Sequence, residues 1–456
     1  MNLPLEFKEK YEKVLGKEEF EKFLVSFDSP AVSAYRINPL KNCLEFSKKN
    51  HDKAIPNSPF GYYGKISGKS AAHVMGLVYS QEPAAQMVGS LADIQPGMKV
   101  LDLCAAPGGK STQLLSRLEN QGLLVSNEIS DKRSKILVEN IERFGARNVV
   151  VTKEDSVHLA KVFAGFFDVI VLDAPCSGEG MFRKDPAATQ YWDSTYPAKC
   201  AKLQREIIDN ALEMLAPNGE LVYSTCTWSK EENEDNVRYM LDNYPTLELL
   251  PMPHENGLSG GIEMPEVVRC WPQNFDGEGQ FIAKLRNHAV SADSPLLSAH
   301  KATKSKKKNG KNKKTNAISQ EQMKLWQEFE KKNLKLTFDS QLMQVFGEHL
   351  YLLPAGLPDL SQLKIARDGL YLGEFKKNRF EPSYALGLAL HPEEVKQTLD
   401  ISLEDFNKYV AGETLAVNTD QAGWTQLTLD GNGLGFAKVV SGTVKNYFPK
   451  GLRYKN

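Results

Sequence analysis

The chain has few cysteines, and none of them stand in the closely spaced pairs that bind zinc. Its 456 residues contain six, at positions 43, 104, 176, 200, 226 and 270, with no C-x-x-C pair. Six thiols in so long a chain are too sparse for the disulfide framework of small secreted domains. The sequence therefore predicts free thiols and no metal site.

Long apolar runs are missing as well. No stretch approaches the roughly 20 consecutive apolar residues that span a bilayer, and the first residues, Met1 to Lys8, lack the apolar core of a signal peptide. We therefore expect a cytoplasmic protein with no membrane partner.

Neither sign of charge is in excess. The chain has 56 basic and 57 acidic residues, and its net charge is -1. Any affinity for nucleic acid must therefore come from local basic patches and not from the field of the whole molecule.

Between residues 98 and 285 short apolar runs alternate with helical patterns, which favours a parallel, doubly wound α/β sheet of the Rossmann type. Five such runs are Val100–Leu103, Leu123–Val125, Val149–Val151, Val169–Leu172 and Leu221–Tyr223. Further on, residues 301–314 carry eight lysines and no hydrophobic side chain larger than alanine. That segment cannot form a core and marks the clearest domain boundary.

These patterns divide the chain into five parts. Residues 1–93 are expected to form a small α+β module, and residues 94–288 the doubly wound domain. A lysine-rich linker, 289–317, then leads to an intermediate α+β region, 318–386, and to a β-rich domain, 387–456.

The first strand of the predicted sheet runs directly into small residues and two glycines, which let the backbone pass close to a ligand before a helix begins. In an open parallel sheet, ligands bind beyond the carboxyl ends of the strands. Acidic residues follow the next strands there, and the one about 20 residues after the glycines is placed to accept hydrogen bonds from ribose hydroxyls. The residues are Cys104, Ala105, Ala106, Pro107, Gly108, Gly109 and Lys110 in the loop, then Glu128, Asp155 and Asp173.

Three other interpretations of this loop are weaker. A phosphate-binding P-loop ending in Gly109-Lys110-Ser111 would need Gly at position 104, where this chain has Cys. A dinucleotide site needs G-x-G-x-x-G, whereas these two glycines are adjacent. A tight turn without a ligand leaves the acidic residues at successive strand ends unexplained.

Two cysteines fall at the same edge of the predicted sheet, Cys176 after the fourth strand and Cys226 after the fifth. A thiolate that adds to carbon 6 of cytosine makes carbon 5 nucleophilic, so one cysteine suits covalent catalysis of methyl transfer to carbon 5. Release of the product needs a second acid or base nearby, and another cysteine can serve. Asp173 and Lys110 are candidates for polarising the base and moving protons. Cys104 is expected to pack without reacting, and the other cysteines, at 43, 200 and 270, to be buried thiols.

The segments Cys104–Lys110, Asp173–Gly180 and Ser224–Thr227 resemble the signature blocks of the RNA 5-methylcytosine methyltransferases. The resemblance implies that Cys226 is the nucleophile and that Cys176 assists product release. It also implies S-adenosylmethionine as the cofactor, bound by Cys104, Ala105, Ala106, Pro107, Gly108, Gly109, Lys110, Glu128, Arg133, Asp155 and Asp173.

Further blocks extend the resemblance over most of residues 1–288. They are Arg36-Ile37-Asn38 with Lys41, the run from Gln81 to Ala85, and the run from Arg269 to Phe281. Two positions depart from the family pattern, because many relatives carry Ser in place of Ala84 and His is frequent in place of Gln273.

The last part of the chain, with Arg379–Pro382 and the basic, aromatic run Lys445–Arg453, resembles the C-terminal extension of bacterial F-type 16S ribosomal RNA methyltransferases. That extension ends in a PUA-like domain. The resemblance implies RNA-binding roles for residues 1–93 and 387–456. It implies as substrate one or more cytosines in the decoding region of 16S rRNA, within the 30S subunit. We expect a monomer.

Other groups suit RNA contacts. Phe182-Arg183-Lys184 and Trp228 fit phosphate contacts and stacking around an extruded base, although the same residues would serve equally in a core or in solvent. The lysine-rich linker suits RNA phosphates, or is simply solvated.

Four alternative functions remain. A DNA cytosine methyltransferase would use Cys176 as the attacking thiol and leave Cys226 without a role. A 5-methylcytosine methyltransferase acting on tRNA would carry the same catalytic blocks. A catalytically silent ribosome assembly factor needs neither thiol. An amino-group methyltransferase usually shows N-P-P-Y after the fourth strand, where this chain has Asp173-Ala174-Pro175-Cys176.

Overall fold

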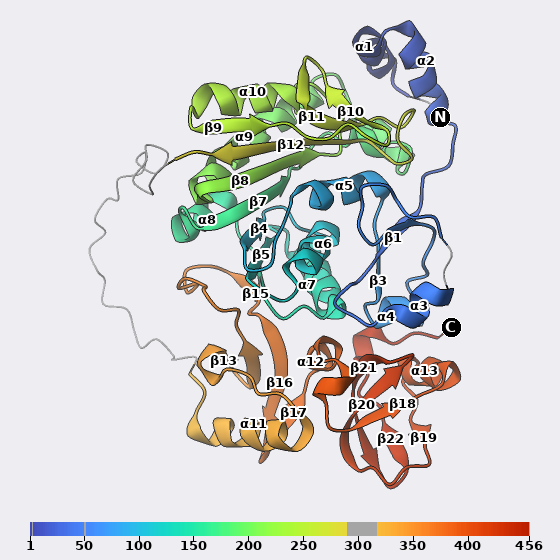
Figure 1. Cartoon of the computed structure of the whole chain (residues 1–456), viewed down its shortest axis with the longest axis vertical. Helices are drawn as coiled ribbons and strands as arrows, with labels where there is room; N and C mark the ends of the chain where they lie inside the picture. The colour runs from blue at the N-terminus through green and yellow to red at the C-terminus, as the bar shows by residue number, and fades with distance from the viewer. Residues whose placement is uncertain (2, 50–51, 290–316, 456) are drawn as a thin grey trace, which may run out of the picture.

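A ten-stranded mixed sheet forms the centre of the computed structural model, which describes residues 1, 3–49, 52–289 and 317–455 (Figure 1). The strand order is β10-β11-β12-β8-β7-β4-β5-β6-β15, with β9 beside β12. Five neighbouring strands are parallel: β4 (Lys99–Asp102), β5 (Leu123–Asn127), β6 (Val149–Thr152), β7 (Phe167–Asp173) and β8 (Leu215–Thr225). The predicted doubly wound sheet is confirmed, and all five expected strands are present.

Helices cover both faces of the parallel strands, which explains why those strands are almost continuously apolar. One face packs against α5 (Pro83–Leu91), α6 (Gly109–Leu118) and α7 (Asp131–Phe144). The other packs against α8 (Ser156–Phe163), α9 (Tyr196–Met214) and α10 (Glu234–Asn243). The chain order reverses between β4 and β7, so the topological switch point, where ligands bind in such sheets, lies between these two strands.

Antiparallel strands complete the sheet at both edges. On the β8 side lie β12 (Gln280–Asn287), β11 (Met264–Cys270), β10 (Leu258–Gly261) and β9 (Leu247–Leu250). On the β6 side the edge strand is β15 (Ile365–Arg367), which comes from the C-terminal half of the chain. The sheet is therefore built from both halves of the sequence.

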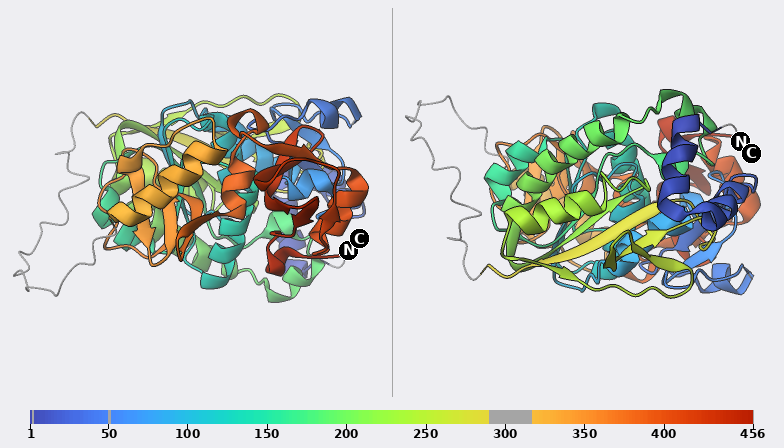
Figure 2. Two further views of the ribbon diagram at one scale, coloured as in Figure 1. Left: turned by 90° about the horizontal axis from the view of Figure 1, so that it is seen from below. Right: turned by 90° about the horizontal axis from the view of Figure 1, so that it is seen from above.

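The N-terminal module consists of two helices and a small sheet. Helices α1 (Leu5–Leu15) and α2 (Lys17–Ser26) bury an aromatic face against residues of the central domain, among them Phe182, Trp192, Trp228 and Trp271. Figure 2 shows these helices, in dark blue, lying against the central domain. Strands β1 (Ala34–Ile37), β2 (Gly61–Tyr63) and β3 (Val78–Ser80) form a three-stranded sheet, accompanied by α3 (Leu44–Lys49) and α4 (Ala71–Val74).

The C-terminal half contains two further sheets. Helix α11 (Gln320–Asn333) packs with a four-stranded sheet of β13 (Met343–Phe346), β14 (His349–Leu352), β16 (Leu370–Lys376) and β17 (Arg379–Pro382). After α12 (Tyr384–Ala389) comes a five-stranded sheet with α13 (Leu403–Val410), made of β18 (Thr398–Asp400), β19 (Leu415–Ala416), β20 (Gly423–Leu429), β21 (Asn432–Val440) and β22 (Thr443–Lys445).

The last sheet shares its core with the N-terminal module. Tyr35, Val74 and Val78 of that module pack in one cluster with Phe406 and Leu427 of the C-terminal sheet. In Figure 1 the two segments lie side by side, blue against red. The expectation of a separate tail therefore needs this qualification: the C-terminal sheet has its own strands but not a wholly separate core. The predicted linker falls almost entirely on residues 290–316, outside the described residues.

Within the described residues, no helix is both long and apolar enough to cross a membrane. All six cysteines are free thiols.

Candidate active site

The two cysteines singled out in the sequence lie next to each other. Strands β7 and β8 are paired in parallel with Asp173 opposite Ser224, so the loops that follow them leave the same edge of the sheet. Cys176 follows one strand and Cys226 the other, and their sulfur atoms are 3.4 Å apart. Thiols from two different loops thus share one site.

The hydrogen bond with Cys226, together with burial, raises the pKa of the Cys176 thiol well above its ordinary value. Cys176 therefore stays protonated at neutral pH and can donate a hydrogen bond to the Cys226 sulfur. Burial also raises the pKa of Cys104, and the negative charges of Asp102, Asp173 and Glu128 add to the effect. A thiol in that state does not act as a nucleophile.

An ion pair lies beside the cysteines. Lys110 Nζ is 2.7 Å from Asp173 Oδ2. Asp173 Oδ1 accepts hydrogen bonds from Ser224 Oγ at 2.8 Å and from Gln280 Nε2 at 3.2 Å. Burial lowers the pKa of Lys110, but the charge and hydrogen bond of Asp173, and then the charge of Cys226, outweigh it and raise the pKa overall. Lys110 therefore remains a cation near Cys226.

Side chains of α7 hold the loop that follows β4. Gly108, with φ +111°, adopts the left-handed conformation that favours glycine and caps α6. Arg133 Nη2 donates to the Ala106 carbonyl at 2.7 Å, and Asn140 Nδ2 donates to the Pro107 carbonyl at 2.6 Å. Because both carbonyls are engaged on the α7 side, the loop keeps a fixed course past the switch point.

Two buried carboxylates flank this loop and fit the predicted cofactor. Glu128 is 3% exposed, and its Oε2 lies 3.2 Å from Arg133 Nη1. Asp102 is fully buried, its Oδ2 accepts from Ser111 Oγ at 2.7 Å, and its Oδ1 has no hydrogen-bond partner among the described residues. Burial raises the pKa of Asp102 to about 7. An orphaned buried acceptor calls for a ligand donor. The carboxylates suit a ligand that carries positive charge and hydroxyls, as S-adenosylmethionine does.

Asp155 stands at the end of β6 as expected. Its carboxylate caps α8 by accepting from the His158 backbone N–H at 2.9 Å, and the His158 ring contacts the same group. The side chain is 43% exposed, so it lies at the rim of the site and not within it. The structure thus brings Glu128 and Asp155 to the ends of neighbouring strands, while their cofactor-binding roles stay predictions.

Two buried carboxylates behind the cysteine loops were not singled out from the sequence. Glu232 accepts from the Ser177 backbone N–H at 3.0 Å and from Gln204 Nε2 at 2.8 Å. Glu179 accepts from Trp192 Nε1 at 3.0 Å and from Thr227 Oγ1 at 2.7 Å. They fasten the loop that carries Cys176 to the segment after Cys226. Nothing in their spacing distinguishes them from surface glutamates.

The block around Arg36 and Gln81 supports the start of α6. Arg36 is buried, donates to the Gly109 carbonyl at 2.7 Å and Thr112 Oγ1 at 2.8 Å, and bonds Gln81 Oε1. Burial lowers its pKa to about 10. This motif therefore ties the N-terminal module to the glycine loop.

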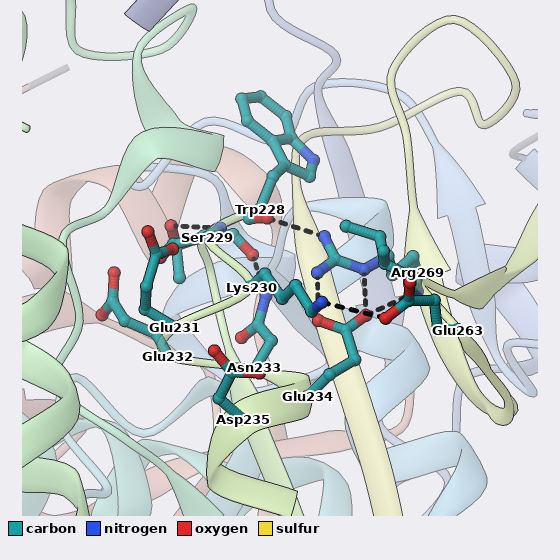
Figure 3. A network of polar contacts seen from close by, with 12 residues as sticks. Trp228, Ser229, Lys230, Glu231, Glu232, Asn233, Glu234, Asp235, Glu263 and Arg269 are labelled. Carbon is teal, nitrogen blue, oxygen red and sulfur yellow. Dashed lines mark hydrogen bonds and ion pairs between the residues drawn. The ribbon is translucent and has the colours of Figure 1, made fainter. Parts of the chain in front are cut away.

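A further polar network fixes the turn after Cys226 (Figure 3). Arg269 Nη1 donates to the Trp228 carbonyl at 2.8 Å, and its Nε donates to Glu234 Oε1 at 2.7 Å. Arg269 and Glu234 are almost completely buried, at 1% and 0% exposure of their side chains. Asn233 Nδ2 donates to the Thr227 carbonyl at 2.9 Å. The guanidinium and the amide together hold the chain where it leaves Cys226.

Of the two interpretations left open for Phe182, Arg183 and Trp228, RNA contact or a place in the core, the structure supports the core. Phe182 is 0% and Trp228 2% exposed, and Trp228 stacks on Trp271 with 5.9 Å between ring centroids. The Arg183 guanidinium pairs with Glu278 at 3.1 Å. The reason is α1 and α2, whose aromatic side chains build a core here. Of the predicted group only Lys184 is exposed.

Of the remaining cysteines, Cys270 is buried as expected, whereas Cys43 and Cys200 are partly exposed. For Cys43 the expectation of a buried thiol is therefore too strong, and the same holds for Cys200.

Family models match nearly all of the described chain. The model described as 16S rRNA methyltransferase RsmB/F matches residues 90–286, and that for the N-terminal domain of 16S rRNA methyltransferase RsmF matches residues 3–83. The RsmF rRNA methyltransferase first C-terminal domain matches residues 328–390, and the methyltransferase RsmF PUA domain residues 396–454.

Full-length relatives agree. The chain is 30% identical to a ribosomal RNA small subunit methyltransferase F from Vibrio campbellii, over 100% of this chain and 98% of that protein. The chain belongs to the RsmB/F family of 16S rRNA methyltransferases. A protein of the same name from Escherichia coli is 31% identical over 95% of this chain and 92% of its own length.

A solved structure shows the same fold. A methyltransferase homologue from Pyrococcus horikoshii is 30% identical, with a TM-score of 0.55, and covers 62% of this chain and 94% of its own. Membership in the RsmB/F family confirms the resemblance drawn from the sequence. It also confirms the predicted enzyme class, an S-adenosylmethionine-dependent rRNA (cytosine-C5) methyltransferase.

Proposed function

We propose that this RsmB/F-family enzyme methylates carbon 5 of one or more cytosines in the decoding region of 16S rRNA within the 30S subunit, and that Cys226 is its nucleophile. The observation that carries the proposal is the pair of thiols, 3.4 Å apart, at the rim that also holds the glycine loop. A single thiol there would suit an inert core residue. Two thiols on neighbouring strand ends suit addition and elimination at one pyrimidine.

The cysteines carry out the covalent steps. The Cys226 thiolate adds to carbon 6 of the cytosine, which makes carbon 5 nucleophilic. When bound, S-adenosylmethionine supplies the electrophilic methyl group. Carbon 5 then passes its proton to water, the electrons of that C–H bond re-form the C5–C6 double bond, and the S–C6 bond breaks with its electrons returning to the Cys226 sulfur. Cys176 lies within hydrogen-bond reach of the leaving sulfur and assists this elimination by donating its proton toward that sulfur.

Lys110 and Asp173 prepare the site for these steps. The Lys110 cation lies near Cys226 and can stabilise negative charge that develops on the sulfur or the base during the reaction, since opposite charges attract more strongly in a partly buried site. Asp173 is held by Lys110, Ser224 and Gln280, so its carboxylate has a fixed direction in which to receive a hydrogen bond from the base. Polar groups that are already fixed in place stabilise the transition state, because they need no reorganisation during the reaction.

The cofactor would be held at the switch point by the loop of residues 104–110 and the carboxylates that surround it. Glu128 is placed to accept from the ribose hydroxyls, and Arg133 orients both Glu128 and the loop. Asp155 at the end of β6 would complete the set from the rim.

RNA is proposed to contact residues 1–93 and 387–456, divided as the sequence predicts. The matches to the RsmF N-terminal and PUA domains support this division of labour. We further propose that the enzyme works in the cytoplasm as a monomer.

The test is methyl transfer from labelled S-adenosylmethionine to 30S subunits, with naked 16S rRNA and tRNA as parallel substrates. Wild-type protein should label cytosine in the 30S arm, and Cys226→Ala should not. Cys43→Ala, which removes a thiol outside the site, should retain activity. Methyl transfer by Cys226→Ala at the wild-type level would overturn the assignment of Cys226 as the nucleophile. Preferential labelling of tRNA would overturn the proposal that 16S rRNA is the substrate.

A further inference from the structure

The C-terminal half of the chain reaches the edge of the methyltransferase sheet beside the cofactor rim. Strand β15 pairs with β6, with Ile365 opposite Thr152 and Arg367 opposite Val151. The pairing extends past the strand end, where the Lys153 backbone N–H donates to the Lys364 carbonyl at 2.8 Å. Three leucines of the preceding segment, Leu357, Leu360 and Leu363, pack against the core of the sheet.

Glu154 connects this segment to the strand ends. It lies between the last residue of β6 and the rim residue Asp155, and it is 5% exposed. Its Oε1 accepts a hydrogen bond from the Lys364 backbone N–H at 2.9 Å, and Lys364 Nζ lies 3.9 Å from its Oε2. A buried carboxylate is costly unless its hydrogen bonds are made, so the Lys364 amide is a partner that Glu154 needs.

Asn127 carries the connection on to the glycine loop. The Glu154 backbone N–H donates to Asn127 Oδ1 at 3.0 Å, and Asn127 Nδ2 donates back to the Glu154 carbonyl at 2.9 Å. The same Nδ2 donates to the Leu103 carbonyl at 3.2 Å, and the Ala105 backbone N–H donates to the Asn127 carbonyl at 2.8 Å. The ends of β4, β5 and β6, which form the cofactor rim, are thus joined by one side chain.

We propose that Glu154 is a positioning residue for cofactor binding, and that it couples the C-terminal half of the chain to the cofactor rim through the Lys364 amide and Asn127. The inference rests on the proposed location of the cofactor between the glycine loop and Asp155. The C-terminal half then has a second task besides contact with RNA: it holds the β6 end of the rim in place.

Coupling between two interactions in one protein acts equally in both directions. If the Lys364–Glu154 hydrogen bond favours cofactor binding, then cofactor binding must favour that hydrogen bond by the same factor. Addition of S-adenosylmethionine, without RNA, should therefore protect the amides of residues 354–367 from hydrogen exchange. The strands of residues 423–445, which have no part in the connection, should be unchanged.

A matched pair of variants of the full-length protein tests the link. Glu154→Leu has a similar length but accepts no hydrogen bond, whereas Glu154→Gln keeps an oxygen that can accept from Lys364. Glu154→Leu should weaken the calorimetric Kd for S-adenosylmethionine about tenfold, the effect of one lost hydrogen bond to a charged group. Glu154→Gln should restore binding to within about threefold of wild type, and exposed Glu348→Leu should leave it unchanged. The KM for RNA should stay unchanged in Glu154→Leu.

The outcomes separate this inference from the proposed function. If the wild-type protein itself binds no S-adenosylmethionine, the proposed function fails. If the wild type binds it, an unaltered Kd in Glu154→Leu overturns the inference, as does an equal loss of affinity for RNA and cofactor. Should Glu154→Leu fail to fold, hydrogen exchange of the wild type decides alone, and a lack of cofactor-dependent protection at residues 354–367 overturns the proposal.

Discussion

Cys176 and Cys226 stand 3.4 Å apart on neighbouring strand ends, yet their surroundings differ. Cys176 is the thiol whose pKa is raised, through its hydrogen bond to Cys226 and burial, while Cys226 has the Lys110 cation nearby. The Lys110 cation beside Cys226 agrees with the proposed roles, in which Cys226 attacks and Cys176 transfers a proton. In the chemistry of DNA cytosine methyltransferases the cysteine at position 176 would attack instead.

Loss of the Cys176 thiol should trap the reaction halfway. We predict that Cys176→Ala still forms the Cys226–RNA bond but resolves it at least 100-fold more slowly, the usual contribution of a positioned acid or base. A denaturing gel should then show a slowly migrating protein–RNA band. The double variant Cys176→Ala/Cys226→Ala is the control and should show no such band. Rapid turnover by Cys176→Ala would contradict the role of Cys176 in release.

The Lys110–Asp173 pair should matter for chemistry more than for folding. Asp173→Asn keeps the shape but removes the charge that pairs with Lys110 at 2.7 Å. We predict a fall in kcat of about 100-fold or more, with a change in KM for RNA of no more than a few fold. Single-turnover kinetics would measure both. A change confined to KM would mean that Asp173 only binds substrate.

Much of the site could be predicted because its elements are local in sequence. Parallel strands buried on both faces read as apolar runs, and their carboxyl ends fall at one edge. The placement of Cys176, Cys226 and the glycine loop follows from that rule alone. Only the chemical meaning of the two thiols needed a mechanism.

What could not be predicted depends on partners remote in sequence. The sequence left open whether Trp228 stacks on RNA or lies in a core, and the aromatic residues of α1 and α2 that enclose it decide for the core. Strand β15 has only three residues, so no pattern shows that it joins the sheet at β6. Glu232 and Glu179 are buried only because separate loops converge on them, and the sequence around Glu232 is polar.

Glu232 should make stability depend on pH. Burial raises its pKa from an ordinary 4.5 to about 7, even though hydrogen bonds from Ser177 act in the opposite direction. The folded state thus holds this proton more tightly than the unfolded state. The resulting stabilisation is complete below about pH 4.5 and is lost as pH rises through about 7.

Glu232→Gln removes that titration. We predict that the unfolding free energy of wild type, relative to Glu232→Gln, falls by up to about 3 kcal/mol between pH 4.5 and 8. Thermal melts of both proteins at several pH values would measure the difference. Asp102 titrates in both proteins, so its contribution cancels. A difference in stability that does not vary with pH would show that Glu232 is not protonated in the folded state.

The buried Arg269–Glu234 pair and the exposed Lys230–Glu263 pair form a matched comparison within one network (Figure 3). Arg269 and Glu234 are 1% and 0% exposed, whereas Lys230 and Glu263, 3.0 Å apart, are 34% and 72% exposed. Removing one partner of a buried pair leaves an uncompensated charge, so Arg269→Met should cost about 3–5 kcal/mol of stability. Lys230→Met should cost about 0–1 kcal/mol, because water already solvates both partners. Denaturant midpoints of the two variants provide the measurement.

Adding Glu234→Gln to Arg269→Met should recover part of the lost stability, since the orphaned charge disappears. Failure of the double variant to recover any stability would mean that the guanidinium acts mainly through the Trp228 carbonyl, and that the turn after Cys226 depends on that single hydrogen bond.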